Sequence, residues 1–150
     1  MKKLNDGIKE IIEMFSYPFY IVQQDKSFKC TCTNPTTDQA DGTCPLCLGT
    51  GYKIQIRKIK GVSFDSKASF RDQGLDEQTL SCTYYVDAKY PIFKDNLIID
   101  NNNVRYVYRT EYKYSSNKEM VYIKASVHEK KTNPKKILEN FYRLIGGGRP

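Results

Sequence analysis

The stretch Cys30-Thr31-Cys32, together with Cys44-Pro45-Leu46-Cys47-Leu48-Gly49-Thr50-Gly51, is the most informative part of this chain. It contains a C-x-C pair, eleven intervening residues, and a C-x-x-C pair followed by G-x-G. Four thiols in so short a span can surround one metal ion, and Zn²⁺ accepts a tetrahedral shell at about 2.3 Å per Zn–S bond. Gly49 and Gly51 suit the sharp turn after the second pair, because glycine tolerates a positive φ.

The segment between the two cysteine pairs, residues 34–42, is nearly free of large apolar side chains. It cannot build a core of its own, so a bound metal is the natural means of ordering it. We therefore predict one structural Zn²⁺, held by Cys30, Cys32, Cys44 and Cys47. Four thiolates leave no open position for water, which argues against a catalytic zinc.

Two other uses of the cysteines are open at this point. Disulfides are typical of secreted chains. A redox C-x-x-C site would need a βαβ context, which the sequence does not predict. The paired spacing without a nearby histidine favours the metal site over both alternatives.

Residues 44–51 match the pattern C-x-x-C-x-G-x-G at every fixed position. They resemble the repeat found in the zinc domain of J-protein co-chaperones. That family uses such repeats in pairs, whereas the partner pair here, residues 30–32, has no glycines. The resemblance therefore implies a similar zinc-binding knuckle, and it does not imply a chaperone function.

Composition limits the class of protein. The chain has 150 residues, 39% hydrophobic and 27% charged, which is enough for one globular domain with a real core. Its twelve tyrosines favour sheet. No apolar run approaches the ~20 residues of a membrane helix, so we expect no membrane contact. The first residues are not followed by an apolar segment, so we expect no secretion signal and a reducing compartment.

The positive charge is concentrated in the last third of the chain. Residues 1–100 hold 13 basic and 13 acidic side chains, whereas residues 101–150 hold 11 basic and 4 acidic ones. The whole net charge of +7 therefore lies in residues 101–150. Such a surface can meet nucleic acid or an acidic protein, or can simply keep the protein soluble. The candidate contact residues are Lys130, Lys131, Lys135 and Lys136.

Alternating apolar residues predict a mainly β fold, a small β-barrel or meander with short helices at both ends. Strands over residues 17–22 and 52–57 flank the cysteines, which makes the zinc knuckle a hairpin insertion. Further strands are expected at 80–86, 97–100, 104–109 and 120–125, and residues 111–114 either continue the strand at 104–109 or begin another. Residues 60–78 read as a loop, either a functional one or one that hides a short strand. Cys82 alternates with apolar neighbours, so we expect a buried core thiol and not a fifth ligand.

Helical spacing predicts two amphipathic helices, over residues 5–15 and 134–145. We expect a single domain spanning residues 1–150, with the zinc-knuckle insertion at 28–52 and a C-terminal arm and helix at 130–150. The second helix can dock on its own barrel or on another protein. Its place between a basic connector and a glycine tail favours packing on a neighbouring copy or another protein.

The sequence contains no catalytic constellation, and we expect no enzymatic activity. His128 is the single histidine and has no nucleophile near it in sequence. The glycines at 146–148 follow a helix instead of opening one, so they do not form a phosphate-binding loop.

The order of residues 91–100, a turn, and then Val104-Arg105-Tyr106-Val107-Tyr108 resembles the head–tail joining (head-closure, neck) proteins of tailed bacteriophages. Those small barrels carry a similar hairpin, with Gly-Asp commonly found where this chain has Asp95-Asn96. The resemblance covers roughly residues 80–125. It implies a structural virion protein made in the host cytoplasm and placed in the neck of the particle. Copies would form a ring between portal and tail proteins, around packaged DNA.

Two functions therefore compete. One is a zinc-stabilised adaptor of the virion neck, and the other is a nucleic-acid-binding zinc-ribbon protein. In the second, the four lysines and the tyrosine-rich strands would form the contact surface, because aromatic side chains can stack on exposed bases. Tyrosine is equally common at protein interfaces, so composition leaves both hypotheses open, and the strand pattern leads us to expect the adaptor.

Overall fold

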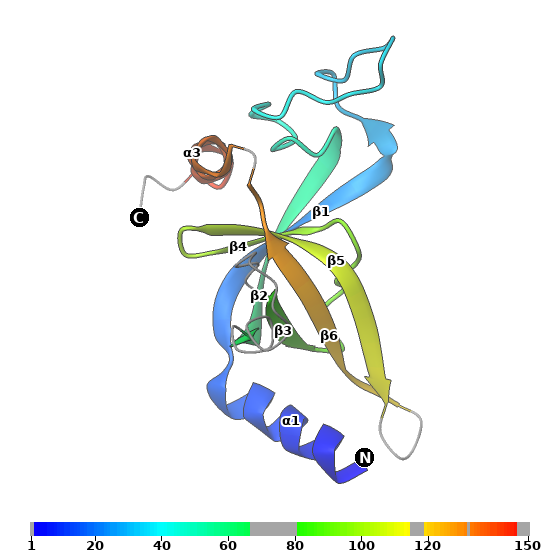
Figure 1. Ribbon diagram of the computed structural model, residues 1–150, viewed down its shortest axis with the longest axis vertical. Helices are drawn as coiled ribbons and strands as arrows, with labels where there is room; N and C mark the ends of the chain where they lie inside the picture. Colours follow the sequence, from blue (N-terminus) through cyan, green and yellow to red (C-terminus); the bar gives the residue numbers. More distant parts are fainter. Residues whose placement is uncertain (1, 67–80, 115–118, 132, 147–150) are drawn as a thin grey trace, which may run out of the picture.

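The computed structural model describes residues 2–66, 81–114, 119–131 and 133–146. Six strands form a closed antiparallel barrel in the order β1-β2-β3-β6-β5-β4, with one helix near each end (Figure 1). This confirms the prediction of a mainly β fold and selects the barrel over an open meander. The elements are α1 (Lys2–Phe15), β1 (Tyr17–Lys29), β2 (Tyr52–Ser66), β3 (Ser81–Asp87), β4 (Leu97–Asp100), β5 (Asn103–Tyr114), β6 (Met120–Glu129) and α3 (Pro134–Leu144).

The interior of the barrel is filled by side chains from all six strands. Because successive residues of a strand point to opposite faces, Ile21 points inward and Val22 outward. The interior cluster is fully buried and includes Phe19, Ile21, Ile59, Cys82, Tyr84, Val86, Ile98, Val107, Ala125 and Val127. Cys82 is thus a core thiol, as predicted.

Two smaller apolar clusters lie on the outside of the barrel, each beneath a helix. Near one end, α1 places Ile12 against Val62 and Tyr122. Near the opposite end, α3 covers an outer cluster of Val22, Leu48, Leu97, Ile99, Val104, Ile137 and Phe141 (Figure 1). None of the helices in the described part of the chain is long and apolar enough to cross a membrane.

The strand β2 is longer than the sequence pattern indicated. It continues through Ser66, so residues 60–66 extend β2 beyond its predicted end, into the stretch that the sequence left as a loop or a short hidden strand. Gly61 caused this error, because glycine usually interrupts a strand. A Cβ at Gly61 would lie 2.9 Å from the Tyr85 carbonyl oxygen and 3.0 Å from the Phe19 ring, so glycine here permits close packing. The rest of the predicted loop, residues 67–78, lies outside the described residues.

The helices also depart from the prediction. α1 begins at Lys2 and not at residue 5. The expectation that the C-terminal helix packs on a neighbouring molecule is wrong for its apolar face, because Ile137 and Phe141 are buried against the barrel of their own chain. Leu144, near the end of the same helix, is 42% exposed.

A buried polar network that the sequence analysis missed joins four strands, β1, β3, β4 and β5. Tyr17 and Tyr84 donate hydrogen bonds to Asp100 Oδ2 at 2.7 and 2.8 Å, and Arg105 lies 3.8 Å from the same oxygen. Burial raises the pKa of Tyr17 to about 12, and the Asp100 carboxylate acts in the same direction. Both tyrosines therefore remain donors at neutral pH and satisfy the buried carboxylate.

Candidate metal centre

The candidate site lies in the connection between β1 and β2. The two strands extend together beyond the barrel as a ribbon, and residues 30–51, here called the knuckle, join their ends (Figure 1). The predicted bounds of the insertion were residues 28–52, and the connection between the two strands spans residues 30–51.

The knuckle brings together the four cysteines that the sequence singled out. The sulfur atoms of Cys30, Cys32, Cys44 and Cys47 all lie within 4.8 Å of one another. The Sγ–Sγ distances are 3.7 Å between Cys30 and Cys44 and 3.6 Å between Cys32 and Cys47. A tetrahedron with metal–sulfur bonds of about 2.3 Å has edges of about 3.8 Å, whereas a disulfide needs about 2.05 Å. The spacing therefore fits a shared metal ion, and it excludes disulfides in this arrangement.

Backbone N–H groups face the sulfur atoms. Gly51 donates to Cys47 Sγ at 3.4 Å. Burial acts to raise the pKa of Cys44, but hydrogen bonds from the N–H groups of Cys47 and Leu46, together with those from the Cys32 and Cys47 thiols, outweigh it and lower that pKa below its usual value. Burial raises the pKa of Cys32 to about 12. Without a metal, Cys32 holds its proton at neutral pH, so metal binding must release it.

The turn after the second cysteine pair requires a left-handed backbone. Leu48, Gly49 and Gly51 have φ of 55°, 83° and 83°. A Cβ at Gly49 would lie 2.9 Å from the Gly42 carbonyl oxygen, so a larger residue there meets both backbone strain and a clash. The G-x-G motif thus has the role that the sequence suggested.

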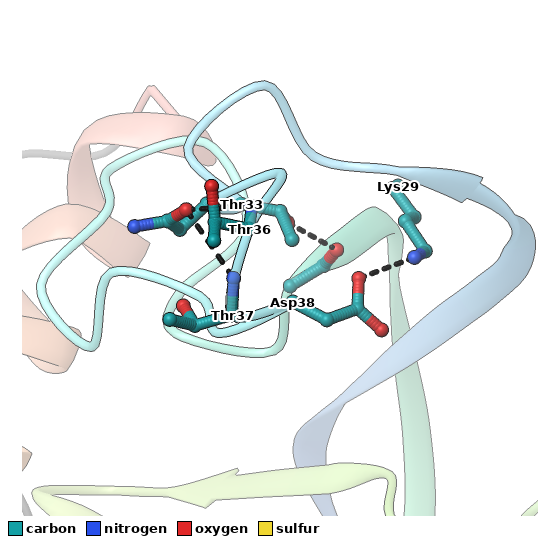
Figure 2. A network of polar contacts seen from close by, with 7 residues as sticks. Lys29, Thr33, Thr36, Thr37 and Asp38 are labelled. Carbon is teal, nitrogen blue, oxygen red and sulfur yellow. Dashed lines mark hydrogen bonds and ion pairs between the residues drawn. The ribbon is translucent and has the colours of Figure 1, made fainter.

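Residues 33–38, the far side of the knuckle, are ordered by hydrogen bonds in place of an apolar core. The Asn34 side chain accepts from the N–H groups of Thr36 and Thr37 at 2.8 and 3.4 Å. Lys29, at the end of β1, pairs with Asp38 (Figure 2). Thr33 donates through its hydroxyl to the Gly51 carbonyl at 3.2 Å. These contacts are exposed or half-buried, so each of them contributes little to the stability of the knuckle.

The helix α3 supports the knuckle from one side. Leu48 is 1% exposed and packs in the outer cluster with Ile137 and Phe141. Asn140 is also buried, and its Nδ2 donates to the Thr43 carbonyl at 3.1 Å. The sequence analysis missed Asn140, because a polar residue on a helix gives no signal of a partner ninety-seven positions away.

The four candidate contact lysines do not form one cluster. Lys130 is half-buried and lines a cleft beside the knuckle. Lys131, Lys135 and Lys136 are exposed, and Lys136 lies 3.6 Å from Glu139 on the next turn of α3. Of the four, Lys130 is the one that lines this cleft.

Comparison with known protein families and with curated proteins gave no match to this chain.

Proposed function

We propose that the four cysteines hold one structural Zn²⁺. The observation that carries this proposal is the close spacing of the four sulfur atoms, all within 4.8 Å of one another, with two Sγ–Sγ distances of 3.6 and 3.7 Å near the edge length of a zinc–thiolate tetrahedron. A tetrahedral S₄ set suits zinc or iron among the common metals, and four thiolates leave no coordination position for a substrate or water. The bound ion would tie the two strands of the ribbon together and fix the knuckle against α3.

Metal analysis of the protein purified without chelator tests this proposal. We expect close to one zinc per chain. Cys44→Ser should abolish stoichiometric zinc because it removes one ligand, whereas Cys82→Ser should retain it, since Cys82 lies inside the barrel. Iron in place of zinc, or full zinc content in Cys44→Ser, would contradict the assignment.

We further propose that the chain is a non-enzymatic structural protein of a tailed bacteriophage virion. In this role it acts as a neck adaptor whose copies form a ring between portal and tail proteins. The closed barrel and its β4–β5 hairpin support this proposal, because the resemblance to head–tail joining proteins lies there. Asp95 supports it too. Its φ is 74°, a conformation that suits the glycine common at this position in that family.

In such an adaptor, the metal would serve assembly by stiffening the ribbon. The knuckle and α3 form one unit at one end of the barrel (Figure 1). A rigid end of this kind can contact a neighbouring copy without losing much conformational entropy on binding.

The oligomeric state tests the adaptor role. Light scattering and negative-stain images of the zinc-loaded protein, alone and with the portal protein, should show rings or a stable complex with the portal. A chain that stays monomeric at high concentration and does not associate with portal or tail proteins would contradict the role. This result would leave the zinc assignment intact, because metal content is measured separately.

A further inference from the structure

The cleft beside the knuckle has a volume of about 340 Å³, within the size range of ligand sites. The knuckle, the β1 ribbon, β4 and β5 contribute to its walls, and Lys130 lies at the point where the chain leaves β6. Its floor includes Leu48 and Leu97, while Lys26, Lys130, Tyr52 and Tyr106 are among its polar lining residues.

Three donor groups of this cleft are unused by the protein itself. Among the described residues, no ion pair or hydrogen bond engages the Lys130 ammonium, the Tyr52 hydroxyl or the Tyr106 hydroxyl. All three residues are half-buried. A half-buried cation with neighbouring hydroxyl donors favours an anionic ligand rich in acceptor oxygens.

The cleft also contains one acidic group. Asp95 lines it, but Lys26 lies 3.4 Å from the Asp95 carboxylate and offsets its charge. With Lys130 added, the lining carries a net charge of +1. The exposed lysines 131, 135 and 136 follow Lys130 along the chain toward α3 and extend the positive charge away from the cleft.

We propose that this cleft binds a phosphate group of a DNA backbone, with Lys130 as the central contact. Lysine and tyrosine side chains are common donors to phosphate oxygens, and such contacts position a strand without reading its sequence. Tyr106 also lies in an aromatic row with His128 and Tyr108, whose ring centroid is 4.1 Å from that of His128. These three rings offer a bound DNA strand an apolar surface beside the basic cleft.

This inference goes beyond the adaptor role and does not depend on ring formation. Of the four lysines that the sequence indicated as contact residues, only Lys130 belongs to the proposed site. Lys26, Tyr52 and Tyr106 are added to it. The cleft is bounded by knuckle residues 48–50, so its shape depends on the ordered knuckle.

Fluorescence anisotropy of the zinc-loaded full chain with a labelled 20-nucleotide DNA, as a duplex and as a single strand, tests the proposal. Lys130→Gln removes the charge at nearly constant size. It should weaken binding severalfold and reduce the slope of log K against log salt by about 0.9 on duplex or about 0.7 on single strand. Tyr106→Phe should weaken binding without changing the slope, because it removes a neutral donor. Lys130→Arg should keep most of the affinity.

The matched control is Lys9→Ala, which removes one exposed lysine from α1 near the opposite end of the barrel (Figure 1). It should leave affinity and slope unchanged. An equal loss in Lys9→Ala would mean diffuse attraction by net charge and would overturn the proposal. The absence of binding at 50 mM salt would also overturn the proposal. Competition by polyglutamate as effective as competition by unlabelled DNA would overturn it too, because it would indicate an acidic protein ligand. Zinc content and thermal unfolding of each variant identify any variant that misfolds. If Lys130→Gln misfolds, the affinity of Tyr106→Phe for DNA tests the proposal independently.

Discussion

Gly49 is the residue at which backbone geometry most constrains the knuckle. Its positive φ is shared with Gly146 at the end of α3, where a Cβ would meet nothing within 4 Å. At Gly49 the same Cβ would lie 2.9 Å from the Gly42 carbonyl oxygen. A comparison of the two glycines therefore separates the free-energy cost of a left-handed backbone from that of a steric clash.

We expect Gly49→Ala to weaken metal binding and to destabilise the protein by about 1–3 kcal/mol, since it adds a contact to the backbone strain. Gly146→Ala carries strain without the contact, and it should cost less and leave metal binding unchanged. Chemical unfolding and competition with a zinc chelator measure the two effects. Equal behaviour of the two variants would show that the approach of Gly42 to Gly49 is unimportant.

Residue type pointed to the four candidate metal ligands because few chemistries use four closely spaced cysteines. The four sulfurs were predicted from sequence alone, and the structure brings them together. Asn140 and Tyr17 could not be found in this way. Their partners, Thr43 and Asp100, are distant in sequence, and a single polar side chain does not indicate which buried group it will satisfy.

At the scale of elements, period-two alternation predicted the barrel strands well where one face is buried and the other is not. It failed beyond residue 57, because Gly61 interrupts the pattern and the apolar residues of β2 do not stay on one face. Ile54 and Ile56 belong to the outer cluster under α3, whereas Ile59 packs inside the barrel and Val62 packs outside it against α1. Register and closure of the sheet were also beyond the sequence, since both depend on pairing between distant strands.

The helix α3 is the element whose role changed most. Phe141 is fully buried and contacts Tyr20 with a ring-centroid distance of 5.0 Å, so the helix belongs to the fold of its own chain. Its solvent-exposed face, with Lys135 and Lys136, remains available to another molecule.

We predict that Phe141→Ala will lower the free energy of unfolding by about 3–5 kcal/mol, because it empties the centre of the outer cluster. Leu144→Ala, on the exposed side of the same helix, is the control and should change stability by no more than about 0.5 kcal/mol. Urea unfolding of both variants provides the measurement. A Phe141→Ala protein as stable as the wild type would indicate that α3 does not dock on the barrel in solution.

For the whole molecule, the barrel and the knuckle depend on different apolar clusters. The interior cluster contains no residue of the knuckle, whereas the outer cluster contains Leu48. The barrel core can therefore form without a metal. Within the knuckle, residues 34–42 have no such support, because they hold no large apolar side chain and rely on short polar contacts.

Removal of the metal should accordingly loosen one end of the molecule and leave the rest folded. Hydrogen exchange after treatment with a strong chelator should show loss of protection in residues 30–51, with a smaller loss in α3, which keeps its contacts to Val22 and Ile99 but loses the support of Leu48. Amides of β3 and β6 should stay protected, because their pairing runs through six residue pairs away from the knuckle. Restoring zinc should restore protection in the knuckle. Uniform loss of protection across β3 and β6 would instead mean that the metal and the barrel form a single cooperative unit, as in small zinc domains that unfold without their ion.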